Sequence, residues 1–278
     1  MQHNKTYTIT AKSKFSLGIK ELFEYRELIY IFTWREIKVK YKQTLLGVLW
    51  VALQPVIMML IINIFLSRYF KQDFENIPYY LYVYSGLIAW NLFASGANTS
   101  VNNILMNANI IKKIYFPRMI IPLSSILSSF VDYCISFFVL FLFMIFEDVS
   151  LILNFNPIYW ILATMIIMLF SFSLGLYFSA LVVKYRDFRY ILPFFIQLLF
   201  FLSPVMYKIQ IDQKILQDIL IYFNPMVLGI ELIRAAVFNV PFLLSLKQTL
   251  IILIILSIYC LIAVLTFRNT EEYIADKI

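Results

Sequence analysis

Reactive side chains are scarce in this sequence, and their spacing excludes the commonest catalytic and metal sites. The single histidine, His3, stands near the N-terminus, and the two cysteines, Cys134 and Cys260, lie inside long apolar runs. These residues supply neither the several ligands of a zinc site nor the base of a nucleophilic catalytic set. None of the six glycines precedes a lysine, which excludes a P-loop. We therefore expect no catalytic residue, cofactor or metal in this chain.

The composition indicates a membrane protein. Of the 278 residues, 62% are hydrophobic and only 14% are charged. A soluble domain carries about 25% charged residues, because it needs them to cover a surface that faces water. This deficit of charge, together with 27 Phe, 19 Tyr and 4 Trp, predicts a single body embedded in lipid.

Six windows are apolar enough to cross a bilayer, whose hydrocarbon core needs about 20 residues of helix. They are 45–66, 79–101, 119–146, 157–183, 190–207 and 248–267. The fifth window is short and contains Pro193 and Pro204, so we expect it to be bent or interrupted. The predicted fold is an all-α integral membrane protein with six transmembrane helices.

Six crossings put both termini on one side, and the Lys and Arg residues indicate which side that is. Segments on the terminal side hold 17 of these residues, and segments on the opposite side hold six. The positive-inside rule therefore predicts that both termini lie in the cytoplasm. Residues 1–20 lack the apolar stretch of a signal peptide, so we expect no cleavage there. The net charge of +7 is thus a topology signal and does not indicate nucleic-acid binding.

Residues 24–42 are predicted to form an amphipathic helix at the cytoplasmic interface, ahead of the first crossing. One face carries Glu24, Glu27, Arg35, Lys38 and Lys42, and the opposite face carries Arg26, Glu36 and Lys40. A helix rich in Lys and Arg beside a membrane binds its surface. The second charged strip indicates a protein contact as well. The alternative is a helix that only anchors the chain to lipid.

A helical hairpin is predicted between the fifth and sixth windows. Segments 207–221 and 226–238 have amphipathic patterns, and Asn224-Pro225 separates them. An Asn-Pro pair favours a turn. We expect two short helices that form a re-entrant hairpin at the outer face. The alternative is an extracellular loop that lies on the lipid headgroups.

Three windows carry polar or small residues at helical spacing. The second has Asn91, Ser95, Asn98 and Asn102, the third has Ser125, Ser129, Asp132 and Ser136, and the fourth has Ser171, Gly175 and Ser179. Polar faces in a bilayer either pack against other helices or line a wet path, and small residues favour close packing. For Asp132 both interpretations stay open: a hydrogen-bonded structural carboxylate, or a carboxylate that faces a path.

Several motifs stand in an order that resembles a known family. The run 34–42 is followed by 46–50 and Gln54-Pro55, then by Lys112-Lys113, 116–118, 185–187, Ser203-Pro204, Tyr207, Asn224-Pro225 and Arg234. As a set, over residues 20–268, they resemble type-2 ABC transporter permeases that export cell-surface polysaccharides.

The resemblance implies the transmembrane permease subunit of an ATP-driven exporter in the bacterial inner membrane. It would pair with a second copy of itself and with two copies of a separate ABC ATPase, which would bind ATP and Mg. Its substrate would be a lipid-linked O-antigen, capsular polysaccharide or teichoic acid. Residues 1–43 would form a cytoplasmic segment with the interface helix, 44–268 the transmembrane domain and 269–278 a cytoplasmic tail.

The resemblance also suggests roles for individual residues. Those expected to couple to the ATPase are Glu24, Glu27, Arg35, Lys38, Asn107, Lys112, Lys113 and Arg118. Those expected to line a path or an outer gate are Tyr84, Trp90, Asn91, Phe93, Asn98, Asp132, Tyr207 and Asn224. Arg186 and Asp187 are expected where a substrate enters from the cytoplasm. The aromatic residues have a second interpretation, because Tyr and Trp also form belts at membrane interfaces.

Two other functions remain open at this stage. A type-2 ABC permease for a drug or a small lipid would carry the same motifs. A membrane-embedded glycosyltransferase or acyltransferase would need an acidic or histidine-based catalytic cluster at an interface, and the sequence contains none.

Overall fold

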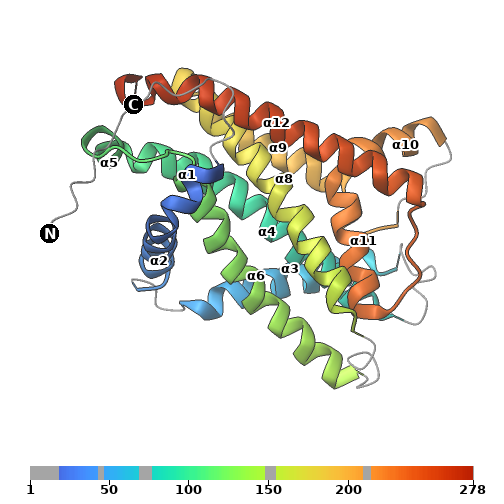
Figure 1. Cartoon of the computed structure of the whole chain (residues 1–278). Coiled ribbons are helices and arrows are strands. Elements are labelled where there is room, and N and C mark those ends of the chain that lie inside the picture. The colour runs from blue at the N-terminus through green and yellow to red at the C-terminus, as the bar shows by residue number, and fades with distance from the viewer. Residues whose placement is uncertain (1–18, 43–46, 69–76, 148–154, 209–213, 278) are drawn as a thin grey trace, which may run out of the picture.

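The computed structural model describes residues 19–42, 47–68, 77–147, 155–208 and 214–277, and within these ranges every regular element is a helix (Figure 1). The helices are α1 (Ile19–Glu24), α2 (Arg26–Lys42), α3 (Val48–Leu66), α4 (Tyr79–Met106), α5 (Ala108–Lys113), α6 (Ile120–Glu147), α8 (Pro157–Lys184), α9 (Phe188–Leu202), α10 (Lys214–Phe223), α11 (Pro225–Phe238) and α12 (Leu246–Lys277). The predicted all-α class is confirmed for the described residues.

Helix α4 is central in the bundle. It packs on α6 and α8 along its length and also contacts α3, α9 and α11. Helix α12 lies along α8, and α2 lies across α6. Figure 1 shows α1, α2, α5 and the C-terminal end of α12 at one end of the bundle, with α10 and α11 at the other end. The two ends therefore present different elements to their surroundings.

Within the described ranges, four helices are long and apolar enough to cross a membrane, or five if the bent pair α10–α11 is one span. The four are α3, α6, α8 and the Leu246–Glu271 part of α12. The other two predicted crossings coincide with α4, which carries the polar stripe and is mostly buried, and α9, which has only 15 residues. The chain is a multi-pass membrane protein, and the number of six crossings stays a prediction.

The outside of the bundle is apolar. Phe65 of α3, Phe194 of α9 and Ile254 of α12 are exposed by 70%, 63% and 59%. Apolar patches of this extent are rare on soluble monomers, because they are unfavourable in water. Hydrocarbon tails solvate such side chains, so these faces suit a lipid environment.

Small residues let α4 and α8 approach closely. A Cβ atom on Gly96 would lie 2.5 Å from Oγ of Ser171, and one on Gly175 would lie 2.9 Å from Cβ of Ser100. Oγ of Ser171 donates to the carbonyl of Phe93 at 3.0 Å. The predicted close packing of the fourth window is confirmed at Ser171 and Gly175.

Two helices begin with Asn-Pro. The Asn156 side chain accepts from the first free amides of α8, and the Asn224 side chain accepts from the Met226 amide at 3.1 Å in α11. Asn is a preferred N-cap, and Pro suits the first helical position. The predicted turn at Asn224-Pro225 is confirmed, with an 85° bend between α10 and α11. All of α11 is buried in the bundle.

Several predicted helix ends differ from the observed ones. Helix α9 ends at Leu202 instead of residue 207, while Pro193 lies inside it without ending it. The interface helix is interrupted at Tyr25, and α10 begins at Lys214, with residues 209–213 outside the described ranges. Helix α12 continues to Lys277, past the predicted end of the sixth crossing. Its extra turns are supported by an Arg268–Glu271 ion pair of 3.1 Å at i, i+3.

Candidate functional site

A groove of about 550 Å³ lies between α3, α4 and α9, and none of the described residues that line it is charged. Its aromatic lining consists of Trp50, Trp90, Phe200 and Phe201, and its amide lining consists of Gln54, Asn91 and Gln197. Apolar side chains fill the remaining wall. Aromatic faces beside neutral hydrogen-bonding groups suit a ligand that carries both C–H faces and hydroxyls.

Three of the four aromatic rings of the groove, those of Trp90, Phe200 and Phe201, contact one another in sequence. The ring centroid of Trp90 lies 5.3 Å from that of Phe200, and Phe200 lies 5.6 Å from Phe201. Trp50 and Phe201 are 51% and 59% exposed, so they form the open rim. Trp90 of α4 is only 7% exposed and forms the floor of the groove. The position of Phe200 and Phe201 therefore depends on where α9 ends.

Of the residues predicted to line a path, Trp90 and Asn91 lie in the groove, but Tyr84 and Phe93 do not. Tyr84 is fully buried and donates to the carbonyl of Ser136 at 3.1 Å. Phe93 is also fully buried, and its ring stacks on Phe170 at 4.9 Å. These two side chains point to α6 and α8, so neither lines this groove.

The groove also contains residues that the sequence reasoning missed. Gln54 and Gln197 each stand within a long apolar run, and their amides line the groove. A lone amide in an apolar helix is costly in lipid unless it faces protein or water. That cost is the signal that could have identified both residues.

Five other predicted residues do not line the groove. Asn98 is partly buried on α4, and Arg186 and Asp187 are exposed where α9 begins. Asn224 is buried and donates to Oγ of Ser203 at 2.9 Å, so it holds backbone in place. Tyr207 donates to the carbonyl of Phe201 at 2.6 Å.

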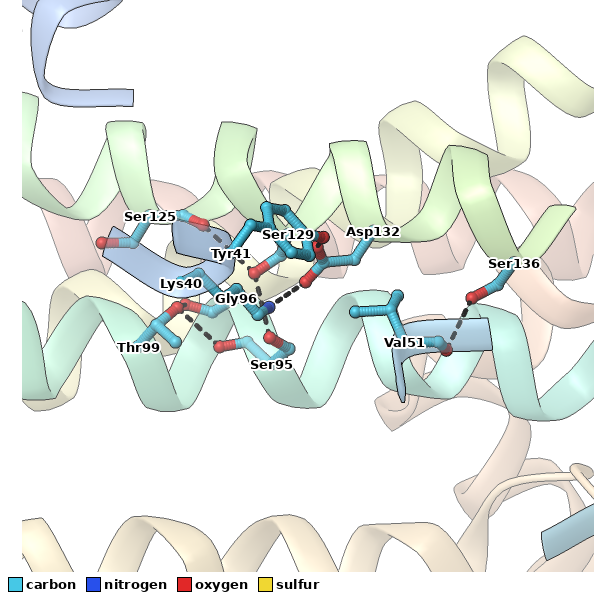
Figure 2. Close-up of polar contacts among 10 residues, drawn as sticks. All are labelled: Lys40, Tyr41, Val51, Ser95, Gly96, Thr99, Ser125, Ser129, Asp132 and Ser136. Carbon is cyan, nitrogen blue, oxygen red and sulfur yellow. Dashed lines mark hydrogen bonds and ion pairs between the residues drawn. The ribbon is translucent and has the colours of Figure 1, made fainter. Parts of the chain in front are cut away.

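The polar face of α6 is paired with other helices, and Figure 2 shows the partners of Ser129, Asp132 and Ser136. Asn103 donates to the Ser125 hydroxyl at 2.8 Å, and the hydroxyls of Ser95 and Ser129 lie 3.1 Å apart. Lys40 and Tyr41 bind Asp132. Ser136 donates to the carbonyl of Val51 at 3.4 Å. These partners come from α2, α3 and α4. The face therefore packs against helices, which is one of the two predicted alternatives.

Two side chains of the interface helix α2 bind Asp132. The ammonium of Lys40 and the hydroxyl of Tyr41 bind its two carboxylate oxygens. The side chain of Asp132 is 13% exposed and that of Lys40 is 40% exposed. The structure thus favours the paired, structural interpretation of Asp132, and it joins a membrane helix to the interface helix.

Two further contacts complete a polar junction between α2, α4 and α6. Arg35 donates to Oδ1 of Asn107 at 2.7 Å, and Ser124 donates to the carboxyl of Glu36 at 3.2 Å. We call Arg35, Glu36, Lys40, Tyr41, Asn103, Asn107, Ser124, Ser125 and Asp132 the polar junction. A cavity of about 400 Å³ opens beside it.

Burial changes the acidity of two groups in the polar junction. Loss of solvent raises the pKa of Glu36 to about 7, although hydrogen bonds from Ser124 and the charge of Arg35 oppose this shift. Burial, together with the Asp132 carboxylate, raises the pKa of the Tyr41 hydroxyl well above its usual value. Glu36 is therefore the group of the junction that titrates near neutral pH.

The remaining predicted coupling residues lie at the same end of the bundle. Glu24, Glu27, Lys38, Lys112 and Lys113 are exposed, and Arg118 is partly buried. The backbone amide of Arg118 donates to Glu271 at 3.0 Å, which ties the loop after α5 to α12. Since Asn107 separates α4 from α5, its bond to Arg35 connects α2 with the exposed lysines of α5.

Comparison with known proteins places this architecture in a family. Residues 27–238, from α2 to the end of α11, match the family described as ABC-2 type transporter. The chain is similar to the O-antigen export system permease protein RfbA of Klebsiella pneumoniae, with 28% identity over 90% of this chain and 95% of the relative. It is also similar to RfbA of Myxococcus xanthus, with 26% identity over 75% of this chain and 79% of the relative. The polysialic acid transport protein KpsM of Escherichia coli is 24% identical over 73% of this chain and 78% of the relative. Because the family match covers more than half of its length, the chain belongs to the ABC-2 type transporter family.

Proposed function

We propose that this chain is the permease subunit of an ABC exporter that moves a lipid-linked polysaccharide across the bacterial inner membrane. The observation that carries the proposal is the uncharged groove of aromatic and amide side chains between α3, α4 and α9. The relatives named for O-antigen export and polysialic acid transport support the same substrate class. The chain is a permease and not an enzyme, and ATP hydrolysis belongs to a separate subunit that would bind ATP and Mg.

The groove suits a passing glycan, because it offers contacts without a fixed binding point. Each sugar ring has C–H faces that pack on Trp or Phe and hydroxyls that exchange hydrogen bonds with Gln or Asn. A chain of repeated sugars can move from one such contact to the next. Without a charge in the lining, no unit of the chain is held by a strong ion pair.

The groove is open along one side, and a second copy of the chain would close it. Trp50 and Phe201 stand exposed at its rim, on α3 and α9. We propose that two copies face each other across this rim and enclose the path. Both termini would then lie in the cytoplasm, with Arg186 and Asp187 where the substrate enters and with α10 and α11 at the outer end.

The polar junction would connect the path to the ATPase. The exposed cations of α2 and α5, among them Lys38, Lys112 and Lys113, form the surface that a separate ATPase subunit would contact. A displacement of α2 would reach α6 through Lys40, Tyr41 and Asp132. We therefore propose that ATPase movement changes the packing of the helices beside the groove.

The groove is tested with two phenylalanines of α9 that are both exposed. Phe201 lines the groove and Phe194 does not. In cells that lack their own exporter permease and carry the partner ATPase, Phe201→Ala should lower the export of glycan to the surface by about fivefold, the equivalent of one aromatic contact of about 1 kcal/mol. Phe194→Ala should leave export unchanged. Equal export by both variants and the parent would remove the groove from the mechanism.

The ATPase surface is tested separately. Replacing Lys112 and Lys113 by Glu should lower the amount of ATPase that co-purifies with the permease, because it reverses the charge of the exposed end of α5. Lys247→Glu is the matched control, since Lys247 is equally exposed but lies at the start of α12, toward the other end of the bundle. Unchanged co-purification of the Lys112 and Lys113 variant would contradict this surface.

A further inference from the structure

The chain leaves helical geometry where α9 ends, and the next three residues, 203–205, are buried. Helix α9 stops at Leu202, and residues 203–207 continue without helical hydrogen bonds. The last carbonyls of a helix and those of an irregular segment have no partner within the segment itself. Inside a membrane protein, such backbone is tolerated only where protein or trapped water satisfies it. The partners of these carbonyls therefore show what holds the segment.

Side chains of α4, α11 and the residue before α11 supply those partners. Asn224 donates to the carbonyl of Leu202 at 3.4 Å. Arg234 donates to the carbonyls of Pro204 and Val205 at 2.6 and 3.1 Å. On α4, Tyr79 donates to the carbonyl of Met206 at 3.1 Å, and Tyr82 donates to that of Tyr207 at 3.3 Å. We call residues 202–207 the strap. Donors from two directions thus fix its backbone.

Arg234 is the most heavily used donor. Its Nη2 serves two strap carbonyls, its Nη1 donates to Glu231 at 3.0 Å, and its guanidinium carbon lies 3.5 Å from the ring centroid of Tyr82. The side chain is 2% exposed. Glu231 compensates the charge, and the ring covers one face of the guanidinium. Arg234 therefore joins α11, α4 and the strap in one contact.

The surroundings of Arg234 exclude a direct contact with a sugar. The cavity beside it, lined in part by Tyr82, Lys208 and Glu231, has a volume of about 20 Å³. That volume accommodates about one water molecule and is far too small for a sugar ring. Arg234 therefore acts on a substrate only through the elements that it holds.

Gly86 lets the strap lie against α4. A Cβ atom at this position would lie 2.7 Å from the carbonyl oxygen of Val205 and 3.2 Å from Nη2 of Arg234. Tyr79, Tyr82 and Gly86 are spaced at i, i+3 and i+7, so one face of α4 carries both the two hydroxyl donors and the glycine that leaves room for the strap. The strap is thus held by α4 and by Arg234, which itself packs against α4 at Tyr82.

We propose that Arg234 is a positioning residue for export: it fixes the strap, and through the strap it sets where Phe200 and Phe201 stand in the groove. Phe201 precedes the strap directly, and the Tyr207 hydroxyl returns from the end of the strap to the Phe201 carbonyl at 2.6 Å. The outer end of the groove is therefore a fixed wall. The proposal rests on the proposed path of the glycan along this groove.

Lysine is not an equivalent residue at this position. An ammonium is a single charged point, whereas the planar guanidinium reaches two carbonyls and a carboxylate while it stacks on a ring. Arg234→Lys keeps the charge beside Glu231 and loses part of the strap contact. Arg234→Met keeps the length of the side chain and loses all of its donors. The two variants thus remove part or all of the hydrogen bonds to the strap at the same position of the chain.

The test measures strap opening and export in the complex with the ATPase, in a chain whose Cys134 and Cys260 are replaced by alanine. A cysteine at Val205, which is fully buried, reports the strap, and one at Ile104, fully buried toward the other end of α4, reports the rest of the fold. Arg234→Met should speed maleimide labelling at position 205 by at least about tenfold, since a hydrogen bond to a charged group is lost. Labelling at position 104 should not change.

Export should follow the same order. Per assembled complex, the rate of glycan export should fall in Arg234→Lys and fall further in Arg234→Met, while ATP hydrolysis continues. Tyr82→Phe removes one strap bond and keeps the ring, so it should give a smaller rise in labelling at position 205. Arg189→Met is the control, because this exposed arginine donates to Asn102 far from the strap. It should change neither readout.

Two results would overturn the proposal. One is unchanged labelling at position 205 in both Arg234 variants. The other is simultaneous exposure of positions 104 and 205 in the Lys variant, which would make Arg234 a residue of the general fold. If Arg234→Met does not accumulate, Arg234→Lys and Tyr82→Phe still decide between these outcomes. The labelling rate does not depend on transport, so the labelling test still decides the role of Arg234 if the groove is not the path of the glycan. In the same way, the Phe201→Ala test still decides the path if Arg234 does not hold the strap.

Discussion

The two ends of the bundle are held by different kinds of contact. At one end, the polar junction joins α2 to α6 through pairs of side chains, and Lys40, in one of these pairs, is 40% exposed. At the other end, the strap is held by side chains that bind backbone carbonyls, and the central donor, Arg234, is 2% exposed. One attachment is partly exposed, and the other is buried.

The difference indicates which end moves. A partly exposed ion pair contributes about 0–1 kcal/mol, because water replaces its partners at little cost. Breaking a buried, hydrogen-bonded pair costs about 3–5 kcal/mol, since the remaining charge is left unpaired. We expect α2 to shift on α6 during a transport cycle, while the strap keeps the outer end of α9 in place.

The largest effect is expected at Arg234. Replacement by Met leaves Glu231 buried without its cation, so the free energy of unfolding should fall by about 3–5 kcal/mol. Lys40→Met should lower it by less, because Lys40 is 40% exposed and Tyr41 still donates to Asp132 when Lys40 is replaced. Thermal unfolding of the purified permease measures both. Equal losses would contradict the contrast between the two ends.

Glycine positions should give the next largest effect. Gly86→Ala puts a Cβ atom against the backbone of the strap, 2.7 Å from the carbonyl oxygen of Val205, and should cost about 1–3 kcal/mol. Gly96→Ala is the matched control on the same helix, because its close neighbour is the hydroxyl of Ser171, which can rotate away. The difference in unfolding midpoint checks this. A larger loss of stability in Gly96→Ala than in Gly86→Ala would show that the strap moves to make room for the added Cβ atom.

A third prediction separates coupling from stability at the polar junction. Asp132→Asn should reduce glycan export while the unfolding free energy changes by no more than about 1–2 kcal/mol, because Lys40 and Tyr41 lose their charged acceptor. The exchanged pair Lys40→Asp with Asp132→Lys should recover part of the export. Recovery of stability without any export would assign Asp132 to packing alone.

The smallest effect concerns pH. Burial raises the pKa of Glu36 from 4.5 to about 7, so the folded protein binds this proton more tightly than the unfolded chain does. The stabilisation is complete below the unfolded pKa and is lost as pH rises through about 7. Stability should therefore fall between about pH 4.5 and pH 7, and Glu36→Gln should flatten that fall. An identical pH profile in the variant would show that another group titrates.

Local signals in the sequence predicted the parts of the fold that depend on neighbouring residues. Asn224-Pro225 encodes its own cap and turn, because both partners of the cap lie within two residues. Long apolar windows marked α3, α6, α8 and α12 for the same reason. The end of α9 was not predictable in this way, since Arg234 holds carbonyls about 30 positions earlier in the chain.

The site was predictable only in part. Helix α4 is buried on most of its faces, so its periodicity does not distinguish Trp90, in the groove, from Phe93, against α8. The pairing of Asp132 with Lys40 joins positions 92 residues apart. Only the three-dimensional packing brings such residues together, and the pattern of residues in one sequence does not indicate it.

The central claim is that glycan passes along the groove, and photocrosslinking tests it most directly. A photoreactive phenylalanine analogue is placed at position 201 in the groove or at position 194 on the lipid-facing side of α9. The permease–ATPase complex is then illuminated during ATP-driven export of labelled glycan. The account predicts a glycan adduct at position 201 and none at position 194. Adducts at neither position, or equally at both, during active export would contradict it.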